Sequence, residues 1–382
     1  MRNPENTVSQ NLLCFSHLRW DFVFQRPQHL MNRFAKNCRV FYMEEPVYVQ
    51  ATVPTLVSYV KTHNLTVIVP HIPVGTSPEE TVELQQILLG SFLESAGEQA
   101  WTFWYYTPIA LEFSRNYKSS LTVFDCMDEL SAFRFAPESL KRLERELIEK
   151  ADVVFTGGHS LYEAKKNLHS NIWPVPSSIE KEHFGKARIS REQPADQAAI
   201  RGTKLGFFGV IDERFDLELI EGLSRKRPDW HIILIGPVVK IDPITLPKGA
   251  NIHYLGQKNY SELPAYISGW DVALIPFAIN ESTEFISPTK TPEYLSAGIP
   301  VISTPIRDVI LPYGIKKLVH IASDTDGFID AVEAILKQGD KTEWLNKVDE
   351  FLKDISWDST QEFMAAQLAL ALNSNLKVSI AS

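Results

Sequence analysis

The sequence has few cysteines, no excess of positive charge and no long apolar run. Its three cysteines, Cys14, Cys38 and Cys126, are spaced neither for a disulfide framework nor for a metal site. The formal net charge of −9 argues against nucleic-acid binding, which needs a basic surface. No segment approaches the ~18 apolar residues of a membrane span, and the polar first ten residues lack the apolar core of a signal peptide. These absences predict a cytoplasmic protein with no nucleic-acid partner.

The composition and the segment pattern predict two α/β domains. The chain has 382 residues, 44% hydrophobic and 22% charged, enough for two domains of roughly 150–190 residues. Short apolar segments alternate with helical patterns, as in parallel sheets covered on both faces. The expected strands are 11–16, 39–44, 65–70, 101–106, 121–126, 152–156, 204–209, 231–236, 252–255, 272–276, 301–304 and 318–321. The expected helices are 27–36, 78–94, 137–150, 216–226, 260–268, 289–297 and 325–337.

The polar, alanine-rich stretch 181–203 interrupts this alternation and is interpreted as a linker. The predicted organisation is a Rossmann-like domain at 1–180, the linker at 181–203, a second Rossmann-like domain at 204–355, and a C-terminal helix and tail at 356–382. Open sheets of this kind bind ligands at the carboxyl ends of their strands, so we expect the site in a cleft between the two domains.

The segment 287–304, SPTKTPEYLSAGIPVIST, carries the strongest functional signal. A helix is expected to begin at Thr289, after Pro288, and Lys290 and Glu293 then lie on one face of its first turns. The helix N-terminus and Lys290 suit a diphosphate. The Glu293 carboxylate can accept hydrogen bonds from a ribose diol, so the pattern favours a sugar nucleotide. The alternative is a solvated surface pair before an ordinary helix-to-strand turn.

This segment resembles the donor-site signature of GT-B glycosyltransferases related to the retaining family with a Glu-x7-Glu motif. The positions that match its second half are Glu293, Gly298, Pro300, Val301 and Ile302. Phe285 stands where the first glutamate of that family falls, and Glu284 lies one residue before it. The run Pro-x-Lys-x-x-Glu-Tyr is similar to bacterial polysaccharide and teichuronic-acid-type members. The resemblance includes segments 15–30 and 124–129, and it implies two Rossmann-like domains facing a cleft, with the donor on the C-terminal one.

Two further positions are candidates for donor binding. Gly209 ends the first strand of the second domain, where a glycine lets backbone amides approach phosphates. Arg214 follows it, and a guanidinium can meet two phosphate oxygens at once. The usual Gly-Arg…Lys-Gly form of the resembling family is absent here. The alternative is a turn with an exposed arginine.

The N-terminal domain supplies the candidates for catalysis and for acceptor binding. Asp128, in the acidic run after the strand 121–126, is the expected general base, with helix capping as the alternative and Asp125 expected to be buried. His17 follows the first strand and is the second catalytic candidate, with a structural role as the alternative. Trp20, in an extended aromatic stretch, and Arg26, at the start of the first helix, are expected to contact the acceptor. The alternative for Trp20 is packing beneath the cleft.

No metal or cofactor is expected. Asp324 and Asp326 match an Asp-x-Asp metal motif, but they follow a late strand and open a helix, which capping explains. Arg214, Lys290 and a helix dipole can neutralise the donor diphosphate instead.

The predicted function is transfer of a sugar from a nucleotide-sugar donor to a glycan or lipid-linked acceptor in cell-surface polysaccharide synthesis. The resemblance implies retention of anomeric configuration, and peripheral contact with the inner face of the membrane is compatible with it. The alternatives are a sugar-nucleotide epimerase of the same fold and an inactive protein that binds nucleotide sugars. A dinucleotide oxidoreductase is disfavoured because no Gly-x-Gly-x-x-Gly follows either first strand.

Overall fold

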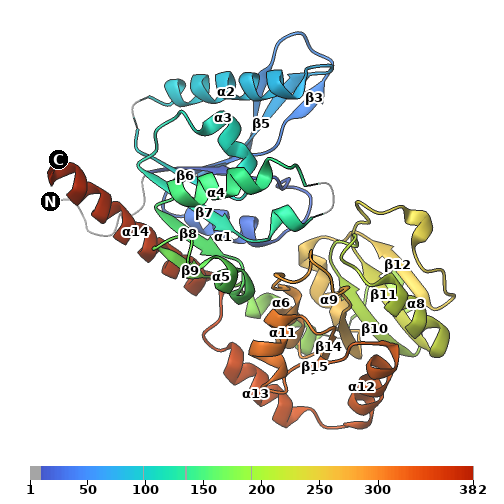
Figure 1. Cartoon of the computed structure of the whole chain (residues 1–382). Coiled ribbons are helices and arrows are strands. Elements are labelled where there is room, and N and C mark those ends of the chain that lie inside the picture. Colours follow the sequence, from blue (N-terminus) through green and yellow to red (C-terminus); the bar gives the residue numbers. More distant parts are fainter. Residues whose placement is uncertain (1–9, 98, 134–135, 191, 382) are drawn as a thin grey trace. The chain divides into compact units, whose positions relative to one another are not determined.

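The computed structural model describes residues 10–97, 99–133, 136–190 and 192–381, with side chains to residue 375 (Figure 1). The chain divides into two compact units. Unit 1 comprises Met1–Val175 and Trp357–Ser382, and unit 2 comprises Pro176–Ser356. Nearly all of the N-terminal stretch from which the absence of a signal peptide is expected lies outside the described residues. No helix in the described ranges is both long enough and apolar enough to cross a membrane.

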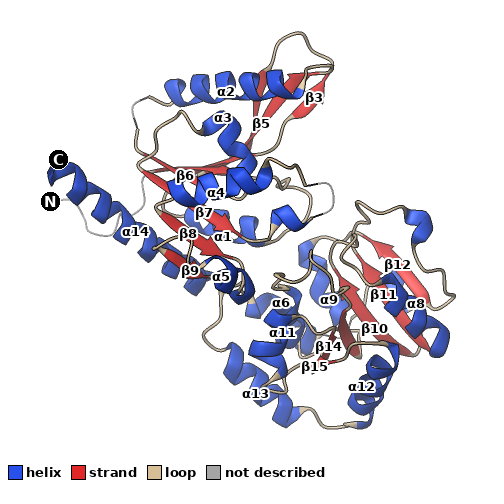
Figure 2. Cartoon of the chain, in the orientation of Figure 1, coloured by secondary structure: helices blue, strands red, loops and turns tan. Residues whose placement is uncertain are grey.

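Unit 1 is built on a mostly parallel sheet with the strand order β3-β5-β2-β1-β6-β7-β8-β9 (Figure 2). One strand, β4, pairs with β5 in the antiparallel direction. The central strands β1 and β6 are buried along their whole length, which explains their continuous apolar sequence. The strands are β1 (Asn11–Phe15), β2 (Arg39–Met43), β3 (Val47–Val49), β4 (Thr55–Thr62), β5 (Leu65–Pro73), β6 (Trp101–Tyr105), β7 (Leu121–Cys126), β8 (Val153–Thr156) and β9 (Ile172–Pro174).

The helices of unit 1 pack on this sheet, and the last helix of the chain returns to it. Helix α14 contacts α1, β7 and β8. Its first residue, Trp357, is buried and stacks on His29 with ring centroids 4.6 Å apart. The helical elements are α1 (Arg26–Phe34), α2 (Pro78–Ser95), η1 (Pro108–Ala110), α3 (Leu111–Ser114), η2 (Leu130–Ala132), α4 (Leu140–Lys150), α5 (His159–Lys165) and α14 (Trp357–Ala381).

Unit 2 has a parallel sheet with the strand order β12-β11-β10-β13-β14-β15. Its strands are β10 (Thr203–Phe208), β11 (Trp230–Ile235), β12 (Ile252–Gly256), β13 (Val272–Ile275), β14 (Val301–Ser303) and β15 (His320–Ile321). Its helical elements are α6 (Lys181–Ile189), α7 (Ala195–Ala198), α8 (Leu217–Lys226), η3 (Pro243–Thr245), η4 (Tyr260–Glu262), α9 (Leu263–Ile267), α10 (Lys290–Ser296), α11 (Arg307–Val309), η5 (Ile310–Gly314), α12 (Thr325–Lys337) and α13 (Thr342–Leu352).

The predicted linker at 181–203 is largely helical in the structure. It forms α6 and α7, and α6 packs against α9 and α10 within unit 2. Gln197 fixes the segment, since its amide donates to the Tyr266 carbonyl at 2.8 Å and accepts from Trp270 Nε1 at 2.9 Å. The unit boundary therefore falls before this segment, at Pro176, and not within it.

Candidate functional site

Two glycine turns bring the ends of β10 and β11 together in unit 2. Gly209 and Gly236 follow these strands with φ angles of 141° and 143°. A Cβ atom on Gly236 would overlap the carbonyl oxygen of Gly209, and a Cβ on Gly209 would overlap the Lys290 side chain. These contacts place Lys290 of α10 directly beside the Gly209 turn. The approach of the Gly209 backbone to phosphates stays a prediction. Only glycine is compatible with these contacts and φ angles.

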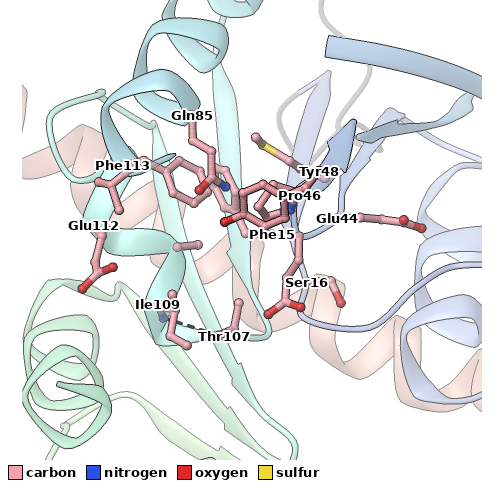
Figure 3. Close-up of a pocket in the computed structure, with 14 residues that line it drawn as sticks. Phe15, Ser16, Glu44, Pro46, Tyr48, Gln85, Thr107, Ile109, Glu112 and Phe113 are labelled. Carbon is pink, nitrogen blue, oxygen red and sulfur yellow. Dashed lines mark hydrogen bonds between the residues drawn. The ribbon is translucent and has the colours of Figure 1, made fainter. Parts of the chain in front are cut away.

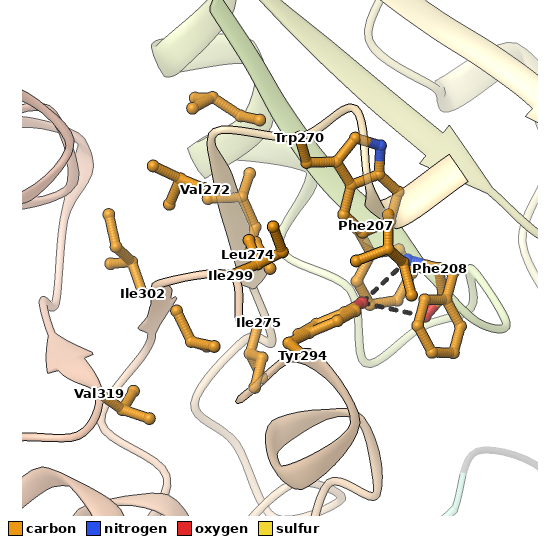
Figure 4. Close-up of a cluster of buried hydrophobic side chains, with 14 of the residues drawn as sticks. Phe207, Phe208, Trp270, Val272, Leu274, Ile275, Tyr294, Ile299, Ile302 and Val319 are labelled. Atoms are coloured by element: carbon orange, nitrogen blue, oxygen red, sulfur yellow. Dashed lines mark hydrogen bonds between the residues drawn. The ribbon is translucent and has the colours of Figure 1, made fainter. Parts of the chain in front are cut away.

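Tyr294 holds α10 against the end of β10 (Figure 4). Its buried hydroxyl accepts a hydrogen bond from the Phe208 N–H at 3.0 Å and lies 3.4 Å from the Phe208 carbonyl oxygen. Its ring packs edge-on against Phe208, with centroids 5.1 Å apart. This anchor fixes the position of Lys290 and Glu293, one turn apart on the same helix. Tyr294 belongs to the Lys-x-x-Glu-Tyr run, but its anchoring role was not predicted from the sequence.

Glu293 is a buried carboxyl group with an unsatisfied oxygen. The residue is 6% exposed, and its Oε2 atom has no hydrogen-bond partner among the described residues. Burial raises the pKa of Glu293 to about 8, against the opposing effect of Lys290, and the neighbouring Glu180 raises it further. A buried polar atom without a partner calls for a functional explanation. Here it is suited to a ligand that donates hydrogen bonds to Glu293.

Pro288, Thr289 and Lys290 lie at the start of α10, and Lys290 is close enough to Glu293 to act on its pKa. Lys290 Nζ lies 5.8 Å from the centre of the Phe207 ring. Thr289 occupies the N-cap position of α10 without a side-chain cap, and the Pro288 carbonyl accepts from Thr291 at 3.2 Å. The structure thus places Lys290 beside Gly209 at the carboxyl end of the unit 2 sheet, with Glu293 one turn further along α10. Their role in donor binding stays a prediction.

Arg214 lies in the loop after β10, but its guanidinium is paired within the protein. Asp212, which is 4% exposed, binds Arg214 Nε at 3.0 Å and Nη2 at 2.6 Å. The Arg214 carbonyl also accepts from the Ala278 N–H at 2.8 Å, which ties this loop to the one after β13. A phosphate at Arg214 would therefore share the guanidinium with Asp212. The sequence could not show this competition.

Arg26 is the predicted site residue whose surroundings differ most from expectation. It is 1% exposed and forms a buried ion pair with Asp125, with Nη2–Oδ1 at 2.8 Å. Its Nη1 donates to the Val175 carbonyl at 2.7 Å. Asp125 is buried, as expected. The guanidinium is enclosed among α1, β7 and the end of β9, so its contacts are structural and an acceptor does not reach it in this conformation.

Asp128 lies in a loop at the carboxyl end of β7 that is held by charged contacts. The adjacent Glu129 pairs with Lys165 at 2.6 Å, and Lys165 also pairs with Glu144 at 2.9 Å. Glu129, and not Asp128, occupies the N-cap position of η2. Asp128 is half-buried. The pKa of Arg26 is raised from its ordinary value, because the lowering effect of burial is outweighed by nearby negative charges, chiefly that of Asp125 and to a smaller extent that of Asp128. The loop therefore presents Asp128 in a fixed, partly accessible position.

The remaining predicted residues of unit 1 follow β1. His17 is half-buried after Ser16. Trp20 packs edge-on against Tyr42 with ring centroids 5.0 Å apart, and its backbone N–H donates to Glu44 Oε1 at 2.7 Å. The chain turns at this point and is not extended as predicted, because the Phe22 N–H bonds back to Arg19 at 3.3 Å. These contacts favour the packing alternative for Trp20.

The Asp-x-Asp segment is accounted for by structural contacts. Asp324 caps α12 by accepting from the Gly327 N–H at 2.9 Å, and Asp326 pairs with Lys226 at 2.5 Å. Within the described ranges, no group of three or more His, Cys, Asp or Glu side chains is arranged to hold a metal ion.

A cavity that the sequence analysis did not anticipate lies at the carboxyl ends of β1, β2 and β6 in unit 1 (Figure 3). Its volume is about 300 Å³. Residues from distant segments line it, among them Phe15 at the end of β1, Gln85 on α2, and Glu112 and Phe113 on α3. The carboxyl edge of a parallel sheet is a usual place for a ligand site.

Comparison with known proteins agrees with this geometry. Residues 204–338 match the family described as "Glycosyl transferases group 1". The chain is 25% identical over 269 residues to the putative teichuronic acid biosynthesis glycosyltransferase TuaH of Bacillus subtilis, covering 65% of this chain and 67% of that protein.

Solved structures share the fold at low sequence identity. A trehalose-6-phosphate protein of E. coli bound with UDP-2-fluoro glucose is 13% identical with a TM-score of 0.67, over 94% of this chain and 99% of that one. The catalytic domain of starch synthase IV of Arabidopsis thaliana, bound to ADP and acarbose, is 11% identical with a TM-score of 0.64, over 96% and 100%. The chain thus has the GT-B fold, and with its group 1 glycosyltransferase domain at residues 204–338 it is a glycosyltransferase.

Proposed function

We propose that this glycosyltransferase moves a sugar from a nucleoside-diphosphate sugar, bound by unit 2, to a glycan or lipid-linked acceptor in cell-surface polysaccharide synthesis. The observation that carries the proposal is Glu293, buried with an unpartnered oxygen beside Lys290 and the Gly209 turn. The name of the Bacillus subtilis relative supports the acceptor class. The nucleotides in the titles of the solved structures support the donor class.

The proposed donor position satisfies the groups that the protein leaves unsatisfied. The two ribose hydroxyls donate hydrogen bonds to the Glu293 carboxylate and so supply the partner that Oε2 lacks. Lys290, whose side chain lies against the Gly209 turn, offsets the charge of the diphosphate at this turn. Arg214 adds a second positive charge at the same loop, oriented by Asp212.

The donor assignment predicts that Lys290→Ala weakens nucleotide binding. A charged hydrogen bond contributes about 1.5–3 kcal/mol, so the dissociation constant should rise roughly 10- to 100-fold. Calorimetric titration would use whichever of UDP, ADP, GDP and dTDP stabilises the parent most in a thermal-shift screen. Lys248→Ala is the matched control, because Lys248 is an exposed lysine of unit 2. Equal binding by Lys290→Ala and the parent would contradict the assignment.

We also propose that transfer needs no metal ion, because protein groups meet the diphosphate charge. Turnover should therefore persist in excess chelator, measured as release of the nucleoside diphosphate. Asp324 and Asp326 already serve as a helix cap and an ion-pair partner. Complete loss of turnover that Mg²⁺ or Mn²⁺ restores would return these two residues to consideration as metal ligands.

Retention of anomeric configuration is part of the proposal and rests on the resemblance around Glu293. The anomeric proton coupling of the product in an NMR spectrum tests it. Phe285 at the position of the first family glutamate, with the neighbouring Glu284 exposed, is the feature that favours an inactive binding protein. Nucleotide binding without turnover on any acceptor would support that alternative. A donor epimer formed without acceptor would support an epimerase.

The proposed location is the cytoplasm, with peripheral contact at the inner face of the membrane where a lipid-linked acceptor would be presented. Cell fractionation with and without high salt tests this location. Recovery of the protein solely outside the cytoplasm would contradict it.

A further inference from the structure

The cavity of unit 1 has the size and the walls of a site for a single sugar ring. Its volume of about 300 Å³ is at the low end of the ~300–1,000 Å³ typical of small-molecule pockets. Phe15 and Phe113 form buried aromatic walls, and Tyr48 lies at the cavity with half of its surface exposed (Figure 3). Aromatic faces suit the C–H face of a pyranose, while polar groups are needed for its hydroxyls.

Gln85 provides a polar group that no protein atom satisfies. It lies on α2, is 6% exposed, and lines the cavity. Its amide has no hydrogen-bond partner in the described part of the chain, and Figure 3 shows its side chain directed toward the rings of the cavity. A side-chain amide can both donate and accept hydrogen bonds, as a sugar hydroxyl also can. The amide at the cavity lining can therefore bind a polar ligand placed in the cavity.

The ionisable side chains of the cavity lining are acidic. Three glutamates, Glu44, Glu45 and Glu112, belong to its lining, and the lining contains no lysine, arginine or histidine among the described residues. Burial raises the pKa of Glu45, and Arg19 opposes this effect. A second negative charge brought against such walls is unfavourable.

The nearby Arg19 is already used by the protein. Its Nη1 binds Glu44 Oε2 at 2.9 Å and the Glu45 carbonyl at 2.6 Å, and its Nη2 binds the Pro46 carbonyl at 3.0 Å. These bonds hold the segment 44–46 at the cavity wall and neutralise Glu44. The guanidinium of Arg19 is therefore bound to the cavity wall, and an anion would have to compete with these hydrogen bonds.

We propose that this cavity binds the acceptor, and that it takes a neutral sugar unit and rejects one that carries a phosphate or carboxylate. The inference rests on the proposed transferase function, and it adds the place and the charge class of the acceptor. The aromatic walls pack on the ring, and Gln85 and the carboxylates of the lining bind its hydroxyls.

The test compares neutral and anionic sugars on the full chain, with the nucleoside diphosphate at saturation. Saturation-transfer NMR would use the methyl α-glycosides of glucose, galactose, mannose, rhamnose and N-acetylglucosamine, with glucose 6-phosphate as the anionic probe. We expect at least one methyl glycoside to bind, and to bind at least tenfold more tightly than glucose 6-phosphate. Equal or tighter binding of glucose 6-phosphate overturns the proposal.

Two variants connect binding to the cavity. Gln85→Leu keeps the volume and removes the amide, so glycoside binding should weaken at least tenfold, whereas Gln86→Leu on the same helix should leave it unchanged. Val82→Phe, which narrows the cavity, serves if Gln85→Leu fails to fold. Unchanged binding in the folded cavity variant, or no glycoside bound by the parent, overturns the proposal. Nucleotide binding is measured separately: its absence from the parent contradicts the proposed function, and its presence without glycoside binding contradicts only this inference.

Discussion

Asp128→Asn should lower turnover by roughly 10²–10⁴-fold, the usual contribution of a general base, while donor affinity stays close to that of the parent. Asparagine keeps the size of the side chain but cannot take a proton from an acceptor hydroxyl. Donor affinity should hold because Lys290, Glu293 and the Gly209 turn belong to unit 2, whereas Asp128 belongs to unit 1. Initial rates at saturating donor, together with calorimetric nucleotide titration, separate the two effects.

A loss of turnover in Asp128→Asn could also come from a change in the folded structure, and the surroundings of Asp128 allow this explanation to be tested. The ion pairs Glu129–Lys165 and Glu144–Lys165 hold its loop, and the substitution Asp128→Asn leaves both pairs in place. The unfolding temperature of Asp128→Asn should therefore remain near that of the parent. Glu138→Gln, which removes an exposed carboxylate from the same connection after β7, is the control for charge alone.

Two outcomes would remove Asp128 from the mechanism. Near-parent turnover would mean that its carboxylate is not a base, and His17 would become the leading candidate in unit 1. Weakened donor binding in step with turnover would instead indicate that Asp128 maintains the structure.

The buried strands were predictable because burial on both faces requires a continuous run of apolar residues within each strand. In β7, for example, burial on both faces of a parallel sheet leaves the continuous run Leu121–Cys126. The antiparallel strand β4 (Thr55–Thr62) is mostly exposed and has no such run, so the sequence analysis missed it. Helix α6 (Lys181–Ile189) was assigned to a linker for a similar reason: it buries only Phe184 and Ala187 within a charged segment.

The residues of the candidate site also differ in how far their positions could be predicted from local sequence. Lys290 and Glu293 are neighbours on one helix, so their spacing alone predicts that they lie together. The burial of Arg26 depends on Asp125, which is 99 residues away in the sequence. Likewise, Gln85 reaches its cavity because α2 packs against α3 and β5. Contacts of this range are set by the tertiary fold, and no local pattern reports them.

Glu293→Gln should stabilise the protein at pH 8 while weakening donor binding. The pKa of Glu293 is raised to about 8 in the folded chain, chiefly by burial, against an ordinary value of 4.5. Between these values the unfolded chain loses the proton and the folded chain keeps it. The free energy of unfolding of the parent should therefore fall as pH rises from 4.5 to 8, by up to about 1.4 kcal/mol per pH unit. Glutamine does not ionise, so the variant lacks this decline.

The variant should exceed the parent by a few kcal/mol at pH 8 and match it near pH 4.5. Denaturant unfolding at the two pH values measures the difference. Glu284→Gln is the control, because Glu284 is an exposed glutamate in the same unit. A parallel pH dependence in parent and Glu293→Gln would show that Glu293 does not carry the raised pKa.

Donor binding should depend on pH in the opposite direction. If the ribose hydroxyls donate to the carboxylate, binding favours ionised Glu293, and the parent must lose a proton to bind. Its affinity should then fall as pH decreases from 8 toward 6, by up to about tenfold per pH unit. Calorimetric titration in buffers of different ionisation enthalpy should detect a released proton, which Glu293→Gln would not release.

Because the diphosphate itself titrates, the decisive quantity is the difference in donor affinity between parent and variant. If this difference in affinity does not vary with pH, the assignment of Glu293 to the ribose is contradicted. If it grows toward pH 8, the Glu293 carboxylate, which destabilises the free protein, is the group that binds the donor.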